Sequence, residues 1–140
     1  MASSENKKIV VVGAGIAGCQ LATKLQASRK DFIIINPTDY LHVTFAAVRS
    51  VAVEGWANKT MVPLEPFFGE RFKKGKVNKI IPNENQEESP GGKVVLESGE
   101  EVEYAYLVIA TGTSVRWPVR LYDIERDDAM SRYAQIVEKV

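Results

Sequence analysis

The sequence has few of the residues that hold metals and form disulfides. It contains one cysteine, Cys19, and one histidine, His42, in 140 residues. A single cysteine excludes an intramolecular disulfide and any Cys-x-x-Cys redox pair. One cysteine and one histidine also argue against a structural zinc site. We therefore expect no metal centre and no dithiol chemistry, and we expect His42 to be structural.

A surplus of charge and a long apolar run are also missing. Lysine plus arginine number 18 and aspartate plus glutamate number 18, which argues against a general nucleic-acid-binding protein, since such proteins use a basic surplus to release counterions from phosphates. No apolar run approaches the length that spans a bilayer, and the polar residues 1–8 are not a secretory signal. Ala2 stands where N-myristoylation needs a glycine. We expect a cytoplasmic protein with no transmembrane segment, with peripheral membrane association as the alternative.

The first forty residues have the pattern of a βαβ unit. Residues 7–12 read Lys-Lys-Ile-Val-Val-Val, which is typical of a strand buried on both faces in a parallel sheet. A glycine-rich turn over 13–18 leads into a helix that we expect over about 16–28. A second apolar strand over 31–35 ends at the turn residues 36–39. Strand, turn, helix and strand within about thirty residues predict a βαβ unit.

The remaining sequence predicts short helices, a β-meander, a further strand and a final helix. The expected elements are a helix over 45–53, a helical turn over 66–69, strands over 77–81, 93–97, 101–104 and 106–110, and a helix that Asp127 and Asp128 cap. Met130, Tyr133, Val137 and Val140 would form one apolar stripe on that last helix. The basic cluster 73–76 is either a solvated loop or a phosphate- or membrane-binding segment.

The glycine turn predicts a dinucleotide site. Gly13-x-Gly15-x-x-Gly18 directly follows a strand and opens a helix, the context in which this motif is informative. The first glycine allows the tight turn, the second lets a pyrophosphate approach the backbone, and the third lets helix and strand pack closely. The amides near Ile16 and Ala17 would point at the phosphates. The alternative is a vestigial turn kept only for packing.

Asn36 and Cys19 flank this turn, and each has two interpretations. Asn36 occupies the end of the second strand, where an acidic residue would accept hydrogen bonds from a ribose. An amide can also bond a hydroxyl group, but more weakly than a carboxylate; otherwise Asn36 is a turn residue. Cys19 is either a thiol activated by the start of the helix or a small residue packed against the sheet.

The strand that follows the meander indicates, through a resemblance to known proteins, which dinucleotide the site binds. Residues 106–113 resemble the apolar-run–Ala-Thr-Gly motif of flavoproteins with two dinucleotide-binding domains. Residues 36–50 and 55–60 resemble the apoptosis-inducing-factor-like group, and within it the ferroptosis-suppressor branch of NAD(P)H:quinone oxidoreductases. The resemblance runs from about Lys7 to the end of the chain. It implies the N-terminal, FAD-binding part of a flavoprotein with the pyridine nucleotide-disulfide oxidoreductase fold.

The same resemblance implies which residues bind FAD. Backbone at the glycine turn would hold the pyrophosphate, Arg49 would contact FAD, and the backbone of Val77 would meet the adenine. Otherwise Arg49 forms a surface ion pair and Val77 is an ordinary strand residue. The predicted cofactor-binding residues are Gly13, Ala14, Gly15, Ile16, Ala17, Gly18, Asn36, Arg49, Val77, Ala110, Thr111 and Gly112. No residue is predicted to act as a catalytic acid or base, or as a metal ligand.

We therefore expect an α/β fold: a Rossmann-like FAD/NAD(P)-binding half-domain in which a parallel sheet carries a β-meander, in three ββα layers. The expected organisation is a disordered terminus over 1–6, an FAD-binding domain over 7–122 and a connecting helix over 123–140. By resemblance this helix leads to an NAD(P)H-binding domain that the chain lacks, because the sequence has no second Gly-x-Gly-x-x-Gly. The expected function is the FAD-binding portion of an NAD(P)H oxidoreductase, inactive alone. A non-catalytic nucleotide-binding or interaction module, or a self-contained NAD-dependent enzyme, are the alternatives.

Overall fold

A computed structural model describes residues 8–113, 116 and 124–139. The predicted disordered terminus and Val140 of the predicted stripe lie outside these residues. The chain divides into two compact units, one of Met1–Pro37 with Glu70–Thr111 and the other of Thr38–Gly69 with Gly112–Val140. The expected division into 7–122 and 123–140 stays a prediction.

A four-stranded parallel sheet forms the centre of the first unit. Its strands are β1 (Ile9–Val12), β2 (Phe32–Asn36), β5 (Phe72–Lys74) and β9 (Tyr106–Ile109). They lie in the order β5-β2-β1-β9, and each neighbouring pair is parallel. The predicted parallel sheet is confirmed, and the apolar residues of β1 account for its place in the middle, since Val10 and Val11 are fully buried.

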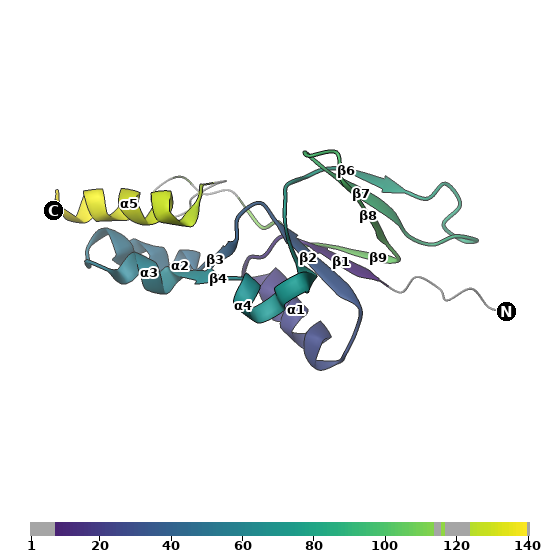
Figure 1. Cartoon of the computed structure of the whole chain (residues 1–140), viewed down its shortest axis with the longest axis horizontal. Helices are drawn as coiled ribbons and strands as arrows, with labels where there is room; N and C mark the ends of the chain where they lie inside the picture. Colours follow the sequence, from purple (N-terminus) through teal and green to yellow (C-terminus); the bar gives the residue numbers. More distant parts are fainter. Residues whose placement is uncertain (1–7, 114–115, 117–123, 140) are drawn as a thin grey trace. The chain divides into compact units, whose positions relative to one another are not determined.

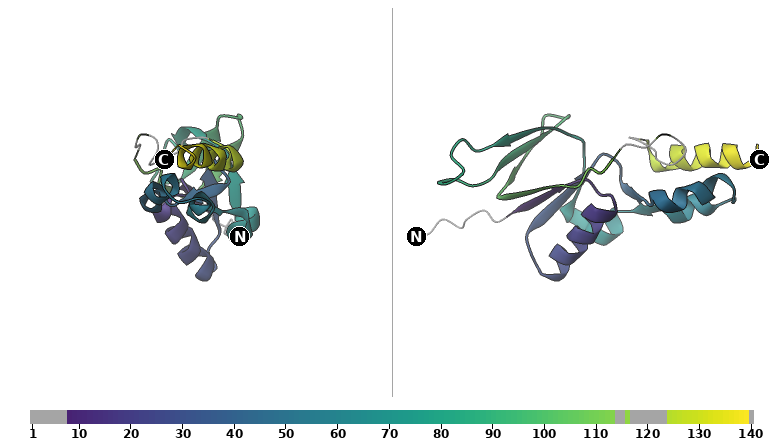
Figure 2. Two further views of the ribbon diagram at one scale, coloured as in Figure 1. Left: turned by 90° about the vertical axis from the view of Figure 1, so that its left-hand side faces the viewer. Right: turned by 180° about the vertical axis from the view of Figure 1, so that it is seen from behind.

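The two faces of this sheet are covered by different layers. Helix α1 (Ile16–Ala27) lies on one face, and the antiparallel sheet of β6 (Val77–Pro82), β7 (Gly92–Leu96) and β8 (Glu101–Tyr104) lies on the other (Figures 1 and 2). Side chains of the two sheets form one core that contains Val10, Val12, Ile35, Val94, Leu96, Val102 and Tyr104. The predicted Rossmann-like half-domain with its β-meander is confirmed.

Small residues let α1 lie close to the sheet. Its buried positions are Gly18 and Ala22, whereas Leu21 and Leu25 are only half-buried. A short side chain on the buried face lets the helix approach the strands, and the start of the helix therefore packs back onto the turn before it.

The second unit consists of short helices, a two-stranded sheet and the C-terminal helix. Its elements are β3 (Tyr40–His42), α2 (Thr44–Ala47), the 3₁₀ helix η1 (Val48–Val51), α3 (Trp56–Thr60), β4 (Met61–Pro63), α4 (Glu65–Phe68) and α5 (Arg126–Val137). A second 3₁₀ helix, η2 (Gly69–Arg71), follows α4. The core of the second unit consists of Tyr40, Ala47, Ala57, Met61, Ala129 and Tyr133. The Tyr40 hydroxyl donates to the Ile124 carbonyl at 2.8 Å, which ties β3 to the entrance of α5.

Three expectations about elements of the two units were wrong in part. The cluster 73–76 is not simply a loop, because Lys73 and Lys74 belong to β5 and pair with β2. The helix expected over 45–53 is divided between α2 and η1. Asp127 and Asp128 do not cap α5; they lie in its first turn after the N-cap Glu125.

The helical turn at α4 and the strands of the meander are found where they were predicted. None of the helices in the described part of the chain is both long and apolar enough to cross a bilayer.

Candidate functional site

The glycine turn passes tightly against the end of β9. Gly13 has φ of +105°, and its amide donates to the Ile35 carbonyl at 2.8 Å. A Cβ at Gly13 would lie 2.4 Å from the Ala110 carbonyl oxygen and 2.9 Å from the Thr111 nitrogen. Both the backbone conformation and the space therefore require glycine here. The structure thus brings Ala110 and Thr111, which are far along the sequence, against the predicted turn.

The other two glycines of the motif have contrasting surroundings. A Cβ at Gly18 would lie 1.9 Å from the Gly13 carbonyl oxygen, so that position is closed. A Cβ at Gly15 would meet nothing within 4 Å among the described residues. Gly15 is the N-cap of α1 with φ of −77°, a conformation open to any residue. Of the three motif glycines, only Gly15 therefore has open space beside it among the described residues.

The start of α1 suits an anion. Within the described structure, no side chain caps this helix end and its first turn contains no acidic residue. Ile16 and Ala17 are exposed. Amides in the first turn of a helix have no partner within the helix, and the helix dipole favours negative charge at this end. The open space beside Gly15 therefore adjoins a group of donors that matches a phosphate.

Asn36 is bonded to the turn itself. Its side-chain oxygen Oδ1 accepts a hydrogen bond from the Ala14 amide at 2.9 Å, which joins the end of β2 to the glycine turn. This bond engages the Ala14 amide, which leaves the amides that follow it to face a ligand. The contact of Asn36 with a ribose stays a prediction.

The remaining predicted site residues fall into both units. Val77 begins β6 opposite Leu96 and packs, half-buried, against the core between the two sheets. Gly112, with φ of +72°, and Arg49 belong to the second unit. Within the first unit the structure therefore gathers Gly13 to Gly18, Asn36, Ala110 and Thr111 at one end of the parallel sheet.

Arg49 has an aromatic neighbour that the sequence analysis missed. Its guanidinium carbon Cζ lies 4.6 Å from the centre of the Trp56 ring, and Lys59 Nζ lies 5.0 Å from the same centre. Cations are attracted to the face of an indole ring. Trp56 thus orients two positive side chains of the second unit. The only sequence signal was the aromatic residue seven positions after Arg49.

Cys19 is a packed thiol. Its Sγ lies 3.4 Å from the Ala14 carbonyl oxygen, to which it donates, and burial raises its pKa from 9.0 to about 11. A thiol with a raised pKa carries little thiolate at neutral pH and is a poor nucleophile. The raised pKa argues against the interpretation of Cys19 as an activated thiol, because burial disfavours the thiolate.

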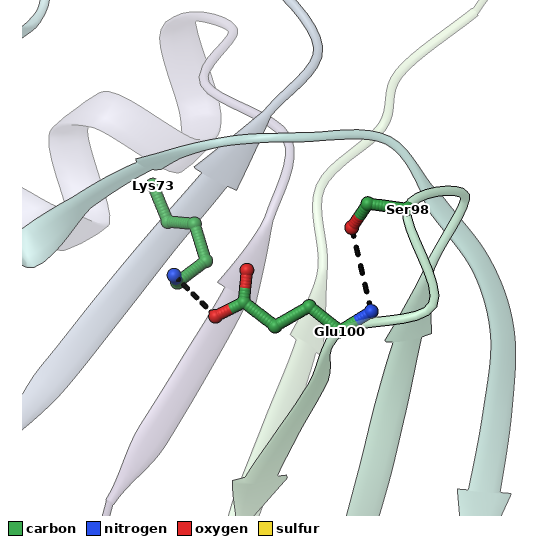
Figure 3. Close-up of polar contacts among 3 residues, drawn as sticks. All are labelled: Lys73, Ser98 and Glu100. Atoms are coloured by element: carbon green, nitrogen blue, oxygen red, sulfur yellow. Dashed lines mark hydrogen bonds and ion pairs between the residues drawn. The ribbon is translucent and has the colours of Figure 1, made fainter.

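Two lysines of the basic cluster are bonded to the meander. Figure 3 shows Lys73 reaching from β5 to Glu100, whose Oε1 lies 2.7 Å from Lys73 Nζ, while the Glu100 amide donates to Ser98 Oγ at 3.4 Å. Lys76 pairs with Glu97 at 3.5 Å. These contacts fasten the edge of the parallel sheet to the turn between β7 and β8, which contradicts a merely solvated loop.

The family comparison covers nearly the whole chain. A family model described as pyridine nucleotide-disulphide oxidoreductase matches residues 7–137. Among curated proteins, ferroptosis suppressor protein 1 of Taeniopygia guttata is 32% identical over 134 residues, which are 95% of this chain and 34% of that protein. Apoptosis-inducing factor homolog A of Dictyostelium discoideum is 27% identical over 139 residues, 97% of this chain and 32% of that protein. The chain spans about a third of the length of these relatives.

Solved structures show the same fold. The sulfide:quinone oxidoreductase of Aquifex aeolicus superimposes on this chain with a TM-score of 0.68 at 25% identity. The superposition covers 95% of this chain and 31% of the oxidoreductase chain. NDH2 of Plasmodium falciparum, solved in complex with NADH, has a TM-score of 0.58 at 16% identity, over 80% of this chain and 23% of its own. The second likeness concerns the fold alone.

Proposed function

The chain belongs to the pyridine nucleotide-disulphide oxidoreductase family, and we propose that it is the FAD-binding portion of an NAD(P)H-dependent flavin oxidoreductase. In this proposal the glycine turn holds the pyrophosphate of FAD, and electrons pass from NAD(P)H through the flavin to an acceptor such as a quinone. One relative, a sulfide-quinone reductase of Aquifex aeolicus at 32% identity over 111 residues, which are 76% of this chain and 24% of that protein, supports a quinone acceptor by its name.

The observation that supports this proposal most is the difference between the three glycines. Gly13 and Gly18 are closed by backbone at 2.4 and 1.9 Å, whereas Gly15 faces open space next to the uncapped start of α1. A turn kept only for packing has no need of a glycine at the open position. A cradle for a pyrophosphate needs one, because a Cβ there would occupy the space of the phosphate.

The residues present fit the adenine half of FAD. The amides of Gly15, Ile16 and Ala17 would bind the pyrophosphate, while Asn36 holds the turn in shape through its bond to Ala14. Val77 would present its backbone to the adenine from the start of β6. Gly18, Ala110 and Thr111 would keep the turn closed from behind. When bound, the flavin supplies the capacity to accept a hydride and to pass electrons on.

We also propose FAD contacts for Arg49 and Gly112, which belong to the second unit. A guanidinium group matches phosphate geometry, and Trp56 would hold it in one orientation. Gly112 adopts the left-handed conformation that the Ala-Thr-Gly turn needs.

We expect this chain by itself to oxidise NAD(P)H poorly. Its sequence contains one Gly-x-Gly-x-x-Gly, and hydride transfer requires a nicotinamide held against the flavin ring. We propose that an NAD(P)H-binding domain is its partner, with residues 123–140 as the connection.

The test is an absorption spectrum of the purified chain after FAD has been added and free flavin removed. We expect a flavin band to remain with the protein, and NAD(P)H oxidation with a quinone to be slow. Arg49→Gln should weaken FAD binding about five- to tenfold, since one charge-assisted hydrogen bond to phosphate is lost. Arg132→Gln, on exposed α5 surface, is the matched control. A chain that retains NAD⁺ but no flavin would refute the proposal in favour of an NAD-dependent protein.

A further inference from the structure

A cavity lies within the second unit, where α5 faces η1, α3 and the loop between them. Helix α5 runs beside α3 in Figures 1 and 2, and the cavity measures about 370 Å³. The residues that α5 contributes follow the spacing of one helix face, from Met130 through Tyr133, Ala134 and Val137 to Glu138. Small-molecule sites usually measure roughly 300–1,000 Å³. The second unit therefore contains a cavity of the size that a small ligand needs.

The walls of this cavity are mostly apolar. Tyr133 and Ala57 are buried, and Met130 and Val137 are half-buried beside them. Apolar ligand surface gains free energy when it moves from water to such surroundings. These walls therefore suit a ligand with an apolar body.

Ser50 supplies a hydrogen-bond acceptor to the lining. Its side chain is buried, at 1% exposure, and its Oγ lies 3.5 Å from Thr60 Oγ1. Thr60 donates its only hydroxyl proton to the Ala57 carbonyl at 2.9 Å, so Ser50 is the donor between the two hydroxyl groups. Because its proton is used in this way, Ser50 meets a ligand with the lone pairs of its oxygen.

Two carboxylates lie at the edge of the cavity. Glu54 and Glu138 line it and are exposed, and neither forms an ion pair with another described residue. Glu138 is also the C-cap of α5, whose last turn contains no basic residue, and this end of a helix carries partial negative charge. Within the described chain, no lysine or arginine lines the cavity. Its negative charge is therefore not balanced from within.

Two cations close to these residues in the sequence have contacts elsewhere. Arg126 donates to the Met61 carbonyl at 3.1 Å and to Asn58 Oδ1, and Lys59 Nζ lies 5.0 Å from the centre of the Trp56 ring. Since Asn58 belongs to the lining, its bond to Arg126 also joins α3 to α5 beside the cavity.

We propose that this cavity binds a small organic amine in its protonated form. The ammonium group lies toward Glu54 and Glu138, and the apolar body packs against Tyr133 and Met130. An ammonium group has three donors and no acceptor, which matches the acceptors of Ser50 and the two carboxylates. The inference goes beyond the proposed function, because the lining lies wholly in the second unit and includes none of the proposed FAD-binding residues.

Calorimetric titration of the chain with phenethylamine, phenethyl alcohol and hydrocinnamate tests this proposal. The three probes share a phenyl body and differ in charge, the amine being an ammonium ion at neutral pH. We expect the amine to bind about fivefold more tightly than the alcohol, because two carboxylates attract it, and the acid to bind more weakly than the alcohol. Added salt should weaken the binding of the amine and leave that of the alcohol unchanged.

Variants of exposed residues locate the binding. Glu54→Gln and Glu138→Gln should each weaken amine binding about two- to threefold and leave alcohol binding unchanged. Glu65→Gln is the matched control, because it removes the same charge from exposed surface of α4 outside the cavity, and it should change neither affinity. Ala134→Leu puts a larger side chain on an exposed part of the lining and should abolish binding of both probes at a wild-type Tm.

Four results would overturn the proposal. They are an alcohol that binds as tightly as the amine, a Glu65→Gln effect equal to that of the two cavity variants, a wild-type chain that binds no amine, and an Ala134→Leu variant that binds the amine normally. The melting temperature of each variant shows whether it is folded. FAD binding is measured separately, so failure of this proposal leaves the proposed function untouched.

Discussion

Substituting alanine for the third and then the second glycine of the turn separates packing from ligand binding. In Gly18→Ala the new Cβ would lie 1.9 Å from the Gly13 carbonyl oxygen and 3.5 Å from the Ala110 Cβ. Carbon atoms in contact are normally about 3.5–4.0 Å apart, so the Ala110 contact is ordinary and the Gly13 contact is a collision. That oxygen belongs to backbone held between β1 and the end of β9, so relief requires α1 or the turn to move.

The magnitude follows from two opposing terms. Overpacking of this kind costs about 3 kcal/mol at the upper end of its usual range, whereas alanine in a helix stabilises by up to about 1 kcal/mol relative to glycine. The net expectation is a loss of about 2 kcal/mol. With an unfolding entropy of roughly 2 cal/mol/K per residue, a chain of 140 residues loses about 3–4 °C in Tm per kcal/mol, so Tm should fall by about 7 °C.

Gly15→Ala is the counterpart with the opposite outcome. Its Cβ meets nothing within 4 Å, and the backbone at φ of −77° accepts alanine. Folding should be unchanged or stabilised by roughly 0.4–1 kcal/mol, because alanine has less freedom in the unfolded chain. FAD binding should weaken about tenfold or more, because the methyl group fills the space of the pyrophosphate.

Thermal unfolding of the FAD-free variants, followed by circular dichroism, measures the first effect, and FAD titration measures the second. The reasoning fails if Gly18→Ala unfolds at the wild-type temperature, since the close approach would then not exist. It fails equally if Gly15→Ala binds FAD with wild-type affinity.

Three further predictions concern single contacts. Burial raises the pKa of the Cys19 thiol from 9.0 to about 11, so stability that is present below pH 9 should be lost as pH rises to about 11. Urea unfolding of Cys19→Ala should lack this part of the pH dependence. A pH profile of Cys19→Ala equal to that of the wild type would contradict the raised pKa. Trp56→Ala should raise the Kd for FAD about two- to fivefold by releasing Arg49, and Trp56→Phe should stay close to wild type. An equal loss of FAD affinity in the two variants would rule out the cation–π contact. Lys73→Gln should lower Tm by less than about 3 °C, because its pair with Glu100 is exposed. A larger fall in a thermal melt would mean that this pair stabilises the fold more than an exposed ion pair does.

The parts of the fold predicted well are those with local signals. The continuous apolar residues of β1 predict a buried parallel strand, and Gly13 to Gly18 predict the turn and helix that follow. The turn at Ser98 and Gly99 likewise predicts the hairpin of β7 and β8.

The elements predicted poorly depend on distant partners. Strand β5 has the sequence Phe-Lys-Lys, which shows neither alternation nor an apolar run, and it is a strand because Ile34, Ile35 and Asn36 of β2 pair with it. The helix expected over 45–53 tightens into a 3₁₀ helix at Val48, and Val51 of that 3₁₀ helix packs against the core that contains Ala129 and Tyr133 of α5. Intrinsic preferences are weak compared with such tertiary contacts.

In the candidate site, the sequence predicted the glycine motif but not the contacts that hold it in place. The bond from the Ala14 amide to Asn36 joins residues 22 positions apart and depends on a side-chain orientation. For Cys19, position on the helix suggested activation, whereas burial raises the pKa of the thiol. Burial depends on what packs over the residue, and a single sequence does not show this.

The pairing of β1 with β9 has a consequence for the order of folding. Ile9 lies beside Tyr106, and the wall behind Gly13 is made by Ala110 and Thr111. Contacts between distant parts of a chain form late, because a long loop must close before they repay its lost entropy. The glycine turn, although it lies far before β9 in the sequence, is therefore completed only when β9 pairs with β1. A nascent chain on the ribosome carries the motif long before it carries the site.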